Sequence, residues 1–225
     1  MLMKGLLRGQ LDELNYQPLP WLKNGGAQRA AGTISRFAAI EKFLKGEGTV
    51  PRVALDIGSH VGFFSLSLAK KGWLVYAVES NKERLYLSYI LSHRIKANIV
   101  PLRLLINTDN VEYLPEADVT LCMSVWHHWV RRYGLEEATF ILKAILRKTR
   151  RFLFFDAGEG EMSDTYKLPY GSEKASEFLS RYLNEFPNLE AVLNLGEHQA
   201  FSPPNEKGVR TQALRTLFCL KKGST

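Results

Sequence analysis

The sequence predicts an α/β fold: a doubly wound, mostly parallel sheet with an antiparallel edge hairpin and an N-terminal helical extension. Short apolar runs alternate with helical patterns between about residues 50 and 157, which is typical of parallel strands joined by crossover helices. Two late strand candidates have no helix between them, which favours an antiparallel pair. The 225 residues are 45% hydrophobic and 24% charged, a composition that suits one globular domain and excludes a disordered or fibrous chain.

Local signals define each element. In chain order the predicted elements are a helix over 32–45, a strand over 52–57, a helix over 63–71, a strand over 74–78, a helix to about residue 96, strands over 99–106 and 119–124, a helix over 135–148, a strand over 152–155, a helix over 172–186, and edge strands over 190–195 and 214–220. Gly46 and Gly72 end helices, and a helix also stops before Pro187. Ser80 and Glu83 match a capping box. The residues of that helix expected to face the core are Leu87, Ile90, Leu91 and Ile95.

Charge, cysteine usage and the length of apolar runs limit the partners, metals and compartment that we expect for this chain. The chain carries 30 basic and 23 acidic residues, which suits a polyanionic partner, but the basic runs 143–151 and 207–222 are interpreted mainly as solvated cations. Cys122 and Cys219 lack metal-ligand spacing, so they are expected to be reduced core residues, and no metal is expected. Because no apolar run reaches the roughly 18 residues of a membrane span, we expect neither an anchor nor a secretory signal, and a cytoplasmic protein.

The first strand-to-helix turn is the predicted ligand site, because doubly wound sheets bind ligands beyond the carboxyl ends of their strands. The turn reads Asp56-Ile57-Gly58-Ser59-His60-Val61-Gly62. A dinucleotide fingerprint would have glycine at 58, 60 and 63, whereas this chain has Gly58, His60 and Phe63. The remaining G-x-x-x-G spacing still allows a ligand to approach the backbone closely.

Two carboxylates indicate the kind of ligand. Asp56 ends the first strand, where it would repel a pyrophosphate and attract ammonium or sulfonium groups. Glu79 ends the second strand, 23 positions later, near the ~20-residue offset of an acidic side chain that binds a ribose diol. A nucleoside that carries a positive sulfur and an amino-acid head is S-adenosylmethionine.

Three runs carry a family resemblance over about residues 50–157. The runs ALDIGSHVGFFSLSLA, VYAVES and DVTLCMSV resemble motifs I, II and IV of the class I S-adenosylmethionine-dependent methyltransferases. The resemblance implies a Rossmann-like class I methyltransferase domain over 49–225, with 1–48 as a helical flap of the same domain. His60 replaces the middle glycine of motif I, at a position that varies in the family.

The resemblance also implies site residues. Asp56, Gly58 and Gly62 would line the methionine portion of the cofactor, and Glu79 the ribose hydroxyls. Asn107 or Asp109 would lie near adenine. The expected cofactor-binding residues are Asp56, Gly58, Ser59, His60, Gly62, Glu79, Asn107, Asp109, Ser124 and Arg29. Arg29, or Arg36 instead, could bind the methionine carboxylate or an anionic substrate.

The run Ser124-Val125-Trp126-His127-His128-Trp129 follows the fourth strand. It is similar to an SVxHH segment of some methyltransferases of bacterial surface-polysaccharide synthesis. His127 or His128 is therefore predicted to be a base or an acceptor-orienting group, because imidazole titrates near neutrality; the alternative is a ring that only holds a loop. The two tryptophans could stack on a sugar or base, although a core position is more common.

The predicted function is O-methylation of a small molecule or glycan by in-line transfer from S-adenosylmethionine. The alternatives are a methyltransferase acting on RNA or another polyanion, a nicotinamide oxidoreductase, and a non-catalytic cofactor-binding subunit that works through a partner. No particular oligomeric state is predicted. The acidic residues after the fifth strand are interpreted mainly as loop solvation, with a metal or acceptor-binding role as the other possibility: Asp156, Glu159, Glu161 and Asp164.

Overall fold

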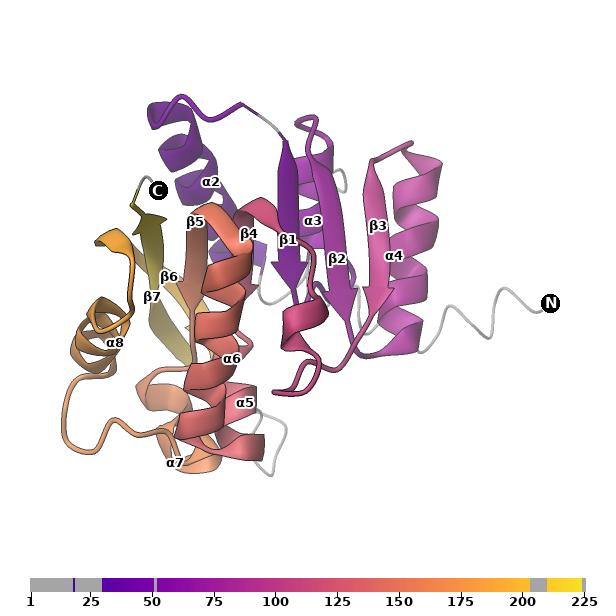
Figure 1. The fold of residues 1–225 in the computed structure, drawn as a ribbon. Helices are drawn as coiled ribbons and strands as arrows, with labels where there is room; N and C mark the ends of the chain where they lie inside the picture. The colour runs from indigo at the N-terminus through magenta and orange to yellow at the C-terminus, as the bar shows by residue number, and fades with distance from the viewer. Residues whose placement is uncertain (1–17, 19–29, 51, 203–209, 224–225) are drawn as a thin grey trace. The chain divides into compact units, whose positions relative to one another are not determined.

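The computed structural model describes residues 18, 30–50, 52–202 and 210–223. The chain divides into two compact units, Met1–Leu105 and Ile106–Thr225, and Figure 1 shows the helices and strands of each. The predicted grouping of 1–48 as a flap on a domain over 49–225 stays a prediction.

The first unit contains three parallel strands and their helices. Its described elements are α2 (Ala30–Gly46), β1 (Val53–Ile57), α3 (Phe63–Ala69), β2 (Leu74–Glu79), α4 (Lys82–Arg94) and β3 (Ile99–Arg103). The strand order is β3-β2-β1, and both pairings are parallel. The register pairs Asp56 with Ala77 and Glu79 with Arg103, so both acidic residues stand at the carboxyl ends of neighbouring strands. The predicted element order is confirmed here.

Helix α2 joins this unit through aromatic packing. The ring of Phe37 lies 6.0 Å from that of Phe63 and 6.4 Å from that of Phe64, measured between centroids. Ile40 and Leu44, on the same side of the helix, are buried. The predicted helix over 32–45 with an apolar face is therefore confirmed for the residues that the structure describes.

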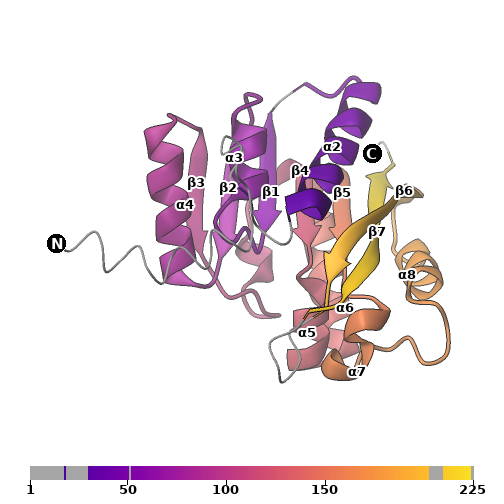
Figure 2. The same cartoon turned by 180° about the vertical axis from the view of Figure 1, so that it is seen from behind.

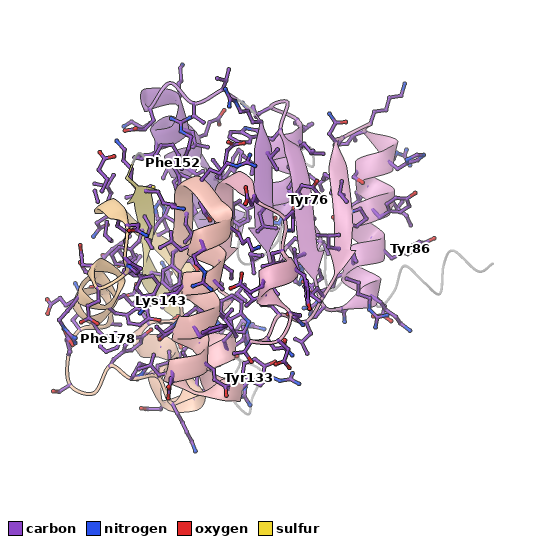
Figure 3. All side chains as sticks on the ribbon, viewed as in Figure 1. Tyr76, Tyr86, Tyr133, Lys143, Phe152 and Phe178 are labelled. Atoms are coloured by element: carbon purple, nitrogen blue, oxygen red, sulfur yellow. The ribbon has the colours of Figure 1, made fainter. Side chains whose placement is uncertain are left out.

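Helix α4 differs from its prediction at its start and on its buried face. Its N-cap is Asn81, whose Oδ1 accepts the backbone N–H of Arg84 at 2.9 Å, so the predicted capping box is wrong. Ile90 is 42% exposed, and it does not face the core. Ser88 is buried instead, because the helix packs closely against the glycine turn: a Cβ on Gly62 would lie 2.4 Å from Ser88 Oγ. Tyr86, labelled in Figure 3, is exposed on α4.

The close packing of α4 against Gly62 predicts the effect of adding a methyl group at position 62. Gly62 has φ +90°, so Gly62→Ala adds backbone strain to the contact with Ser88, and we expect a loss of about 1–3 kcal/mol in the free energy of unfolding. Thermal unfolding followed by circular dichroism measures it. Gly48→Ala is the matched control, because Gly48 also has positive φ but open space around its Cβ position. Equal melting temperatures for the two variants would contradict the close packing.

The second unit combines a parallel pair with an antiparallel hairpin. Its described elements are η1 (Val111–Tyr113), β4 (Ala117–Met123), α5 (Trp126–Tyr133), α6 (Leu135–Lys148), β5 (Thr149–Asp156), η2 (Gly160–Met162), α7 (Ser163–Tyr166), α8 (Ala175–Asn184), β6 (Leu189–Phe201) and β7 (Gln212–Lys222). The strand order is β4-β5-β7-β6; β4 runs parallel to β5, and β7 runs antiparallel to both β5 and β6. Figure 2 shows β6 and β7 as a long hairpin. The mostly parallel sheet class with an antiparallel edge pair is confirmed.

Helix α5 was not predicted. Tertiary contacts fix it: the Nε1–H of buried Trp126 donates to Tyr182 Oη on α8 at 3.2 Å, and Tyr182 Oη lies 2.8 Å from Thr139 Oγ1 on α6. Trp129 is also buried. Both tryptophans are therefore core residues of this unit. Cys122 and Cys219 are buried, reduced thiols, as predicted.

Much of the basic run 143–151 has local partners. Arg147 and Lys148 form ion pairs with Glu112, and Arg150 pairs with Glu116 at 3.0 Å. Lys143, labelled in Figure 3, lies over the ring of Phe186. The interpretation of this run as an ordinary solvated surface fits these contacts, since exposed ion pairs of this kind contribute little to stability. Within the ranges that the structure describes, no helix is long and apolar enough to cross a membrane.

Candidate functional site

The turn after β1 has the backbone conformation that its glycines allow. Gly58, His60 and Gly62 have φ of 70°, 55° and 90°, which places all three on the left-handed side of conformational space. The N–H of Ser59 donates to the carbonyl of Val78 at 2.9 Å, and the N–H of Gly62 donates to the carbonyl of Ser59 at 2.9 Å. The turn is therefore fastened to β2.

Glu79 organises this turn from the end of β2. Its side chain is 6% exposed. Oε2 accepts the backbone N–H of His60 at 3.0 Å, and Oε1 accepts the backbone N–H of Asn81 at 2.8 Å. Oε1 also accepts the hydroxyl of Ser80 at 3.3 Å. Because a carboxylate oxygen has two acceptor sites, Oε2 keeps capacity for one more donor, such as one hydroxyl of a diol, and the long contact with Ser80 is the one that a second hydroxyl would replace at Oε1.

Asp56 is the most strongly perturbed acid in this group. It is 1% exposed, and burial raises its pKa to about 7, with the charge of Glu79 acting in the same direction. The hydroxyl of Ser65 opposes this shift, donating to Asp56 Oδ2 at 2.5 Å. The carboxylate is therefore near its titration midpoint at neutral pH, where a nearby cation would favour the ionised form.

Ser59 adds a buried polar atom to the same turn. Its Oγ is buried, and it has no hydrogen-bond partner among the residues that the structure describes. Since buried polar atoms almost always have partners, this hydroxyl fits a site that binds a further group.

The predicted adenine residues begin the second unit, in a capped turn. Asn107 Oδ1 accepts the backbone N–H groups of Asp109 and Asn110, each at 3.1 Å, and the carbonyl of Asn107 accepts the N–H of Val111 at 3.1 Å. Asp109 is exposed. The side-chain carbonyl of Asn107 thus holds the turn that leads into η1.

Ser124 lies at the end of β4, at a strained position with φ 58°. Its Oγ donates to Asp156 Oδ1 at 2.7 Å and accepts from Arg215 Nη1 at 3.0 Å. Arg215 is 2% exposed, and its Nε donates to Glu161 Oε1 at 2.7 Å. Arg215 was not among the predicted site residues, because nothing local distinguishes one arginine in a strand from its neighbours.

The acidic residues at and after the end of β5 are more buried than the sequence predicted. Asp156 and Glu159 are buried, and the side chain of Glu161 is nearly so, so the interpretation of these three as loop solvation is wrong; Asp164 is exposed. Glu159 Oε1 accepts the N–H of Thr216, and burial raises the pKa of Glu159. The Ser124 hydroxyl binds the carboxylate of Asp156, a backbone amide binds that of Glu159, and Arg215 binds that of Glu161. In the described part of the chain, no group of three or more His, Cys, Asp or Glu side chains could hold a metal ion.

The two histidines of α5 have different surroundings. His127 is 1% exposed, and its Nδ1 accepts the backbone N–H of Gly158 at 2.8 Å. His128 is exposed. Their ring centroids lie 4.4 Å apart, and Tyr166 of α7 packs against both rings at 5.2 and 5.3 Å. The guanidinium of Arg131 lies 5.0 Å from the Tyr166 ring centroid. Tyr166 therefore contacts both imidazoles, and Arg131 packs on Tyr166.

The predicted site residues are distributed over both units. The first unit contains Asp56, Gly58, Ser59, His60, Gly62 and Glu79, and the second contains Asn107, Asp109, Ser124, His127 and His128. Arg29 lies outside the described residues. Arg36 is buried, and its Nε donates to the carbonyl of Gly32 at 3.1 Å; its binding of a carboxylate stays a prediction.

Comparisons with known proteins identify the fold. No protein-family model matches the chain, and no curated sequence matches it. A crystal structure of WbdD, which another structure describes as a bifunctional kinase-methyltransferase, is similar over 97% of this chain and 46% of its own, with 20% identity and a TM-score of 0.71. Magnesium protoporphyrin IX methyltransferase (ChlM) from Synechocystis PCC 6803 with bound SAM is similar over 96% and 92%, with 14% identity and a TM-score of 0.61.

A third match agrees with these two. TehB from Haemophilus influenzae is similar over 88% of this chain and 65% of its own, with 15% identity and a TM-score of 0.61. The chain spans about half the length of the WbdD chain that it matches. At these identities the likeness shows the fold, which is the Rossmann-like fold of these proteins.

Proposed function

We propose that this chain is an S-adenosylmethionine-dependent methyltransferase that methylates an oxygen of a small molecule or glycan. The observation that carries the proposal is the buried carboxylate pair at the ends of β1 and β2, Asp56 and Glu79, next to a turn with left-handed glycines. The fold shared with ChlM, whose structure contains bound SAM, supports the same cofactor.

The residues of the first unit fit this cofactor. The two oxygens of Glu79 would accept the two ribose hydroxyls: Oε2 accepts one backbone N–H and has capacity for another donor, and at Oε1 a ribose hydroxyl would replace the 3.3 Å contact with the Ser80 hydroxyl. Asp56 would stabilise the positive charge of the methionine portion. Ser59 Oγ, which is buried without a partner in the described residues, supplies a further polar contact.

The chain's own residues supply positioning and proton transfer. The bound cofactor would provide a methyl group on a positively charged sulfur, and the transfer is an in-line displacement that depends mainly on orientation and exclusion of water. A hydroxyl acceptor must also lose its proton to a base. We assign acceptor chemistry to the histidine pair of α5, beside Tyr166 and Arg131.

Specific observations disfavour two of the alternatives. The ionised carboxylate of Asp56 at the end of β1 would repel a pyrophosphate bound beside it, which disfavours a nicotinamide cofactor. Arg147, Lys148 and Arg150 have carboxylate partners, which weakens the argument for a polyanionic acceptor, because phosphate contacts need available cations.

Labelled methyl transfer tests the proposal. The purified chain is incubated with isotopically labelled S-adenosylmethionine and fractionated host extract, and we expect label in a small-molecule or glycan fraction. The double variant His127→Ala/His128→Ala should lose this transfer and still bind S-adenosylhomocysteine, because neither ring belongs to the cofactor group. Label in RNA would establish the polyanion alternative. A double variant that keeps full biological activity would establish the non-catalytic subunit.

A further inference from the structure

The hydrogen bond between Gly158 and His127 fixes which ring nitrogen carries the proton. A backbone N–H is always a donor, so Nδ1 of His127, which accepts it at 2.8 Å, must present a lone pair. The neutral ring then has its single N–H at Nε2. The other tautomer would place the Nδ1–H against the backbone N–H of Gly158, so that two donors would face each other at hydrogen-bond distance.

The segment that presents this N–H is anchored at several points. The hydroxyl of buried Tyr170 donates to the carbonyl of Gly158. A Cβ on Gly158 would lie 2.5 Å from Met162 Sδ, so only glycine fits this packing without displacing that side chain. Arg215 donates to Glu161 Oε1 at 2.7 Å and to Met162 Sδ at 3.3 Å. The segment that carries the Gly158 N–H is therefore held by Tyr170, in the loop before α8, and by Arg215 of β7.

His128 has a different environment from its neighbour. It is exposed on α5, and its ring lies beside His127, with Tyr166 packed against both and Arg131 over Tyr166. An exposed imidazole can exchange its proton with solvent, which a base needs in order to turn over. The ring of His127 therefore presents a hydrogen-bond donor, whereas the ring of His128 can accept a proton.

We propose that His127 is held by Gly158 as an Nε2–H hydrogen-bond donor that orients the methyl acceptor, and that His128 is the base. This assignment of roles rests on the proposed function, whereas the tautomer of His127 does not. In the transfer, the acceptor oxygen forms a bond to the methyl carbon, and the carbon–sulfur bond breaks with its electron pair going to sulfur. The acceptor proton goes to a ring nitrogen of His128.

A spectroscopic measurement on the full chain tests the tautomer without an activity assay. Long-range proton–nitrogen correlation spectra of the chain with ¹⁵N-labelled histidine distinguish protonated from unprotonated ring nitrogens, and His127→Gln identifies the His127 signals. We expect a protonated Nε2 and an unprotonated Nδ1 for His127 above neutral pH. A protonated Nδ1 at His127 would overturn the proposal.

Paired variants test the roles. His127→Gln retains an N–H donor near the Nε2 position, whereas His127→Asn lacks reach to it, so we expect Gln to reduce the transfer rate by about tenfold or less and Asn by about 10²-fold. His128→Gln should reduce the rate by about 10²–10⁴-fold and remove the rise of the rate with pH. The reverse pattern, in which His127→Gln removes that rise and His128→Gln keeps it, contradicts the assignment. If the wild-type chain methylates nothing, the proposed function fails, and the spectra still decide the tautomer.

Discussion

Replacing Glu79 by alanine should weaken binding of S-adenosylhomocysteine by at least about 100-fold, which corresponds to about 3 kcal/mol. Two effects add. The variant loses a charged acceptor for the ribose hydroxyls, and hydrogen bonds to charged groups contribute about 1.5–3 kcal/mol each. It also leaves the N–H groups of His60 and Asn81 without the carboxylate that now accepts them, so the turn itself loses its anchor.

Isothermal titration calorimetry measures this loss, and the chain offers a matched control. Glu83 is the same residue type four positions later, exposed in the first turn of α4, with Lys82 at 3.6 Å as an ion-pair partner. Glu83→Ala should bind the ligand as the wild type does. Unchanged affinity in Glu79→Ala would remove Glu79 from the site, whereas equal losses in both variants would point to a general effect of lost negative charge.

The affinity for S-adenosylmethionine should rise with pH through about 7, where Asp56 titrates. If only the ionised carboxylate binds the cationic ligand, affinity at pH 6 should be about tenfold lower than at pH 8. Binding below pH 7 should also release a proton, which titrations in buffers of different ionisation enthalpy detect. Asp56→Asn should bind weakly, with no such pH dependence, while Asp164→Asn, at an exposed acid, should behave as the wild type does.

The raised pKa of Asp56 affects stability in the opposite direction: the chain becomes less stable as pH rises, whereas cofactor binding becomes stronger. Because burial raises the pKa of Asp56 from 3.8 to about 7 in the folded chain, the folded state holds a proton that the unfolded state releases. Its contribution to stability is therefore complete below pH 3.8 and is lost as pH rises to about 7. We expect Asp56→Asn to flatten the fall in melting temperature over this window. Ser65→Ala removes an opposing hydrogen bond, so it should move the binding midpoint to higher pH.

Most of the fold could be predicted because its signals are local. Helix α6 (Leu135–Lys148) has the predicted bounds, since acidic residues in its first turn and basic residues in its last agree with the helix dipole. The N-cap of α4 could not be assigned from the sequence, because Ser80 and Asn81 are both good caps. Only the backbone path in the structure shows that Asn81 is the cap. Helix α5 lacks a side-chain cap and depends on Trp126 packing with Tyr182.

The candidate site divides in the same way. The turn around Gly58 and the acid at Glu79 could be predicted from spacing, since strand ends and glycine positions are visible in the sequence. The environment of His127 could not, because its partner Gly158 lies 31 residues away in a loop with no periodicity. Arg215 and Glu161 are 54 residues apart, and only folding turns an apparent surface acid into a buried ion pair.

A crystal structure of the chain with S-adenosylhomocysteine tests the central claim most directly. We predict that the ribose hydroxyls lie about 2.7 Å from the Glu79 carboxylate oxygens, with the ligand's amino-acid portion over the turn from Gly58 to Gly62. Ligand density at another place on the chain, or none at concentrations that saturate related enzymes, would contradict it.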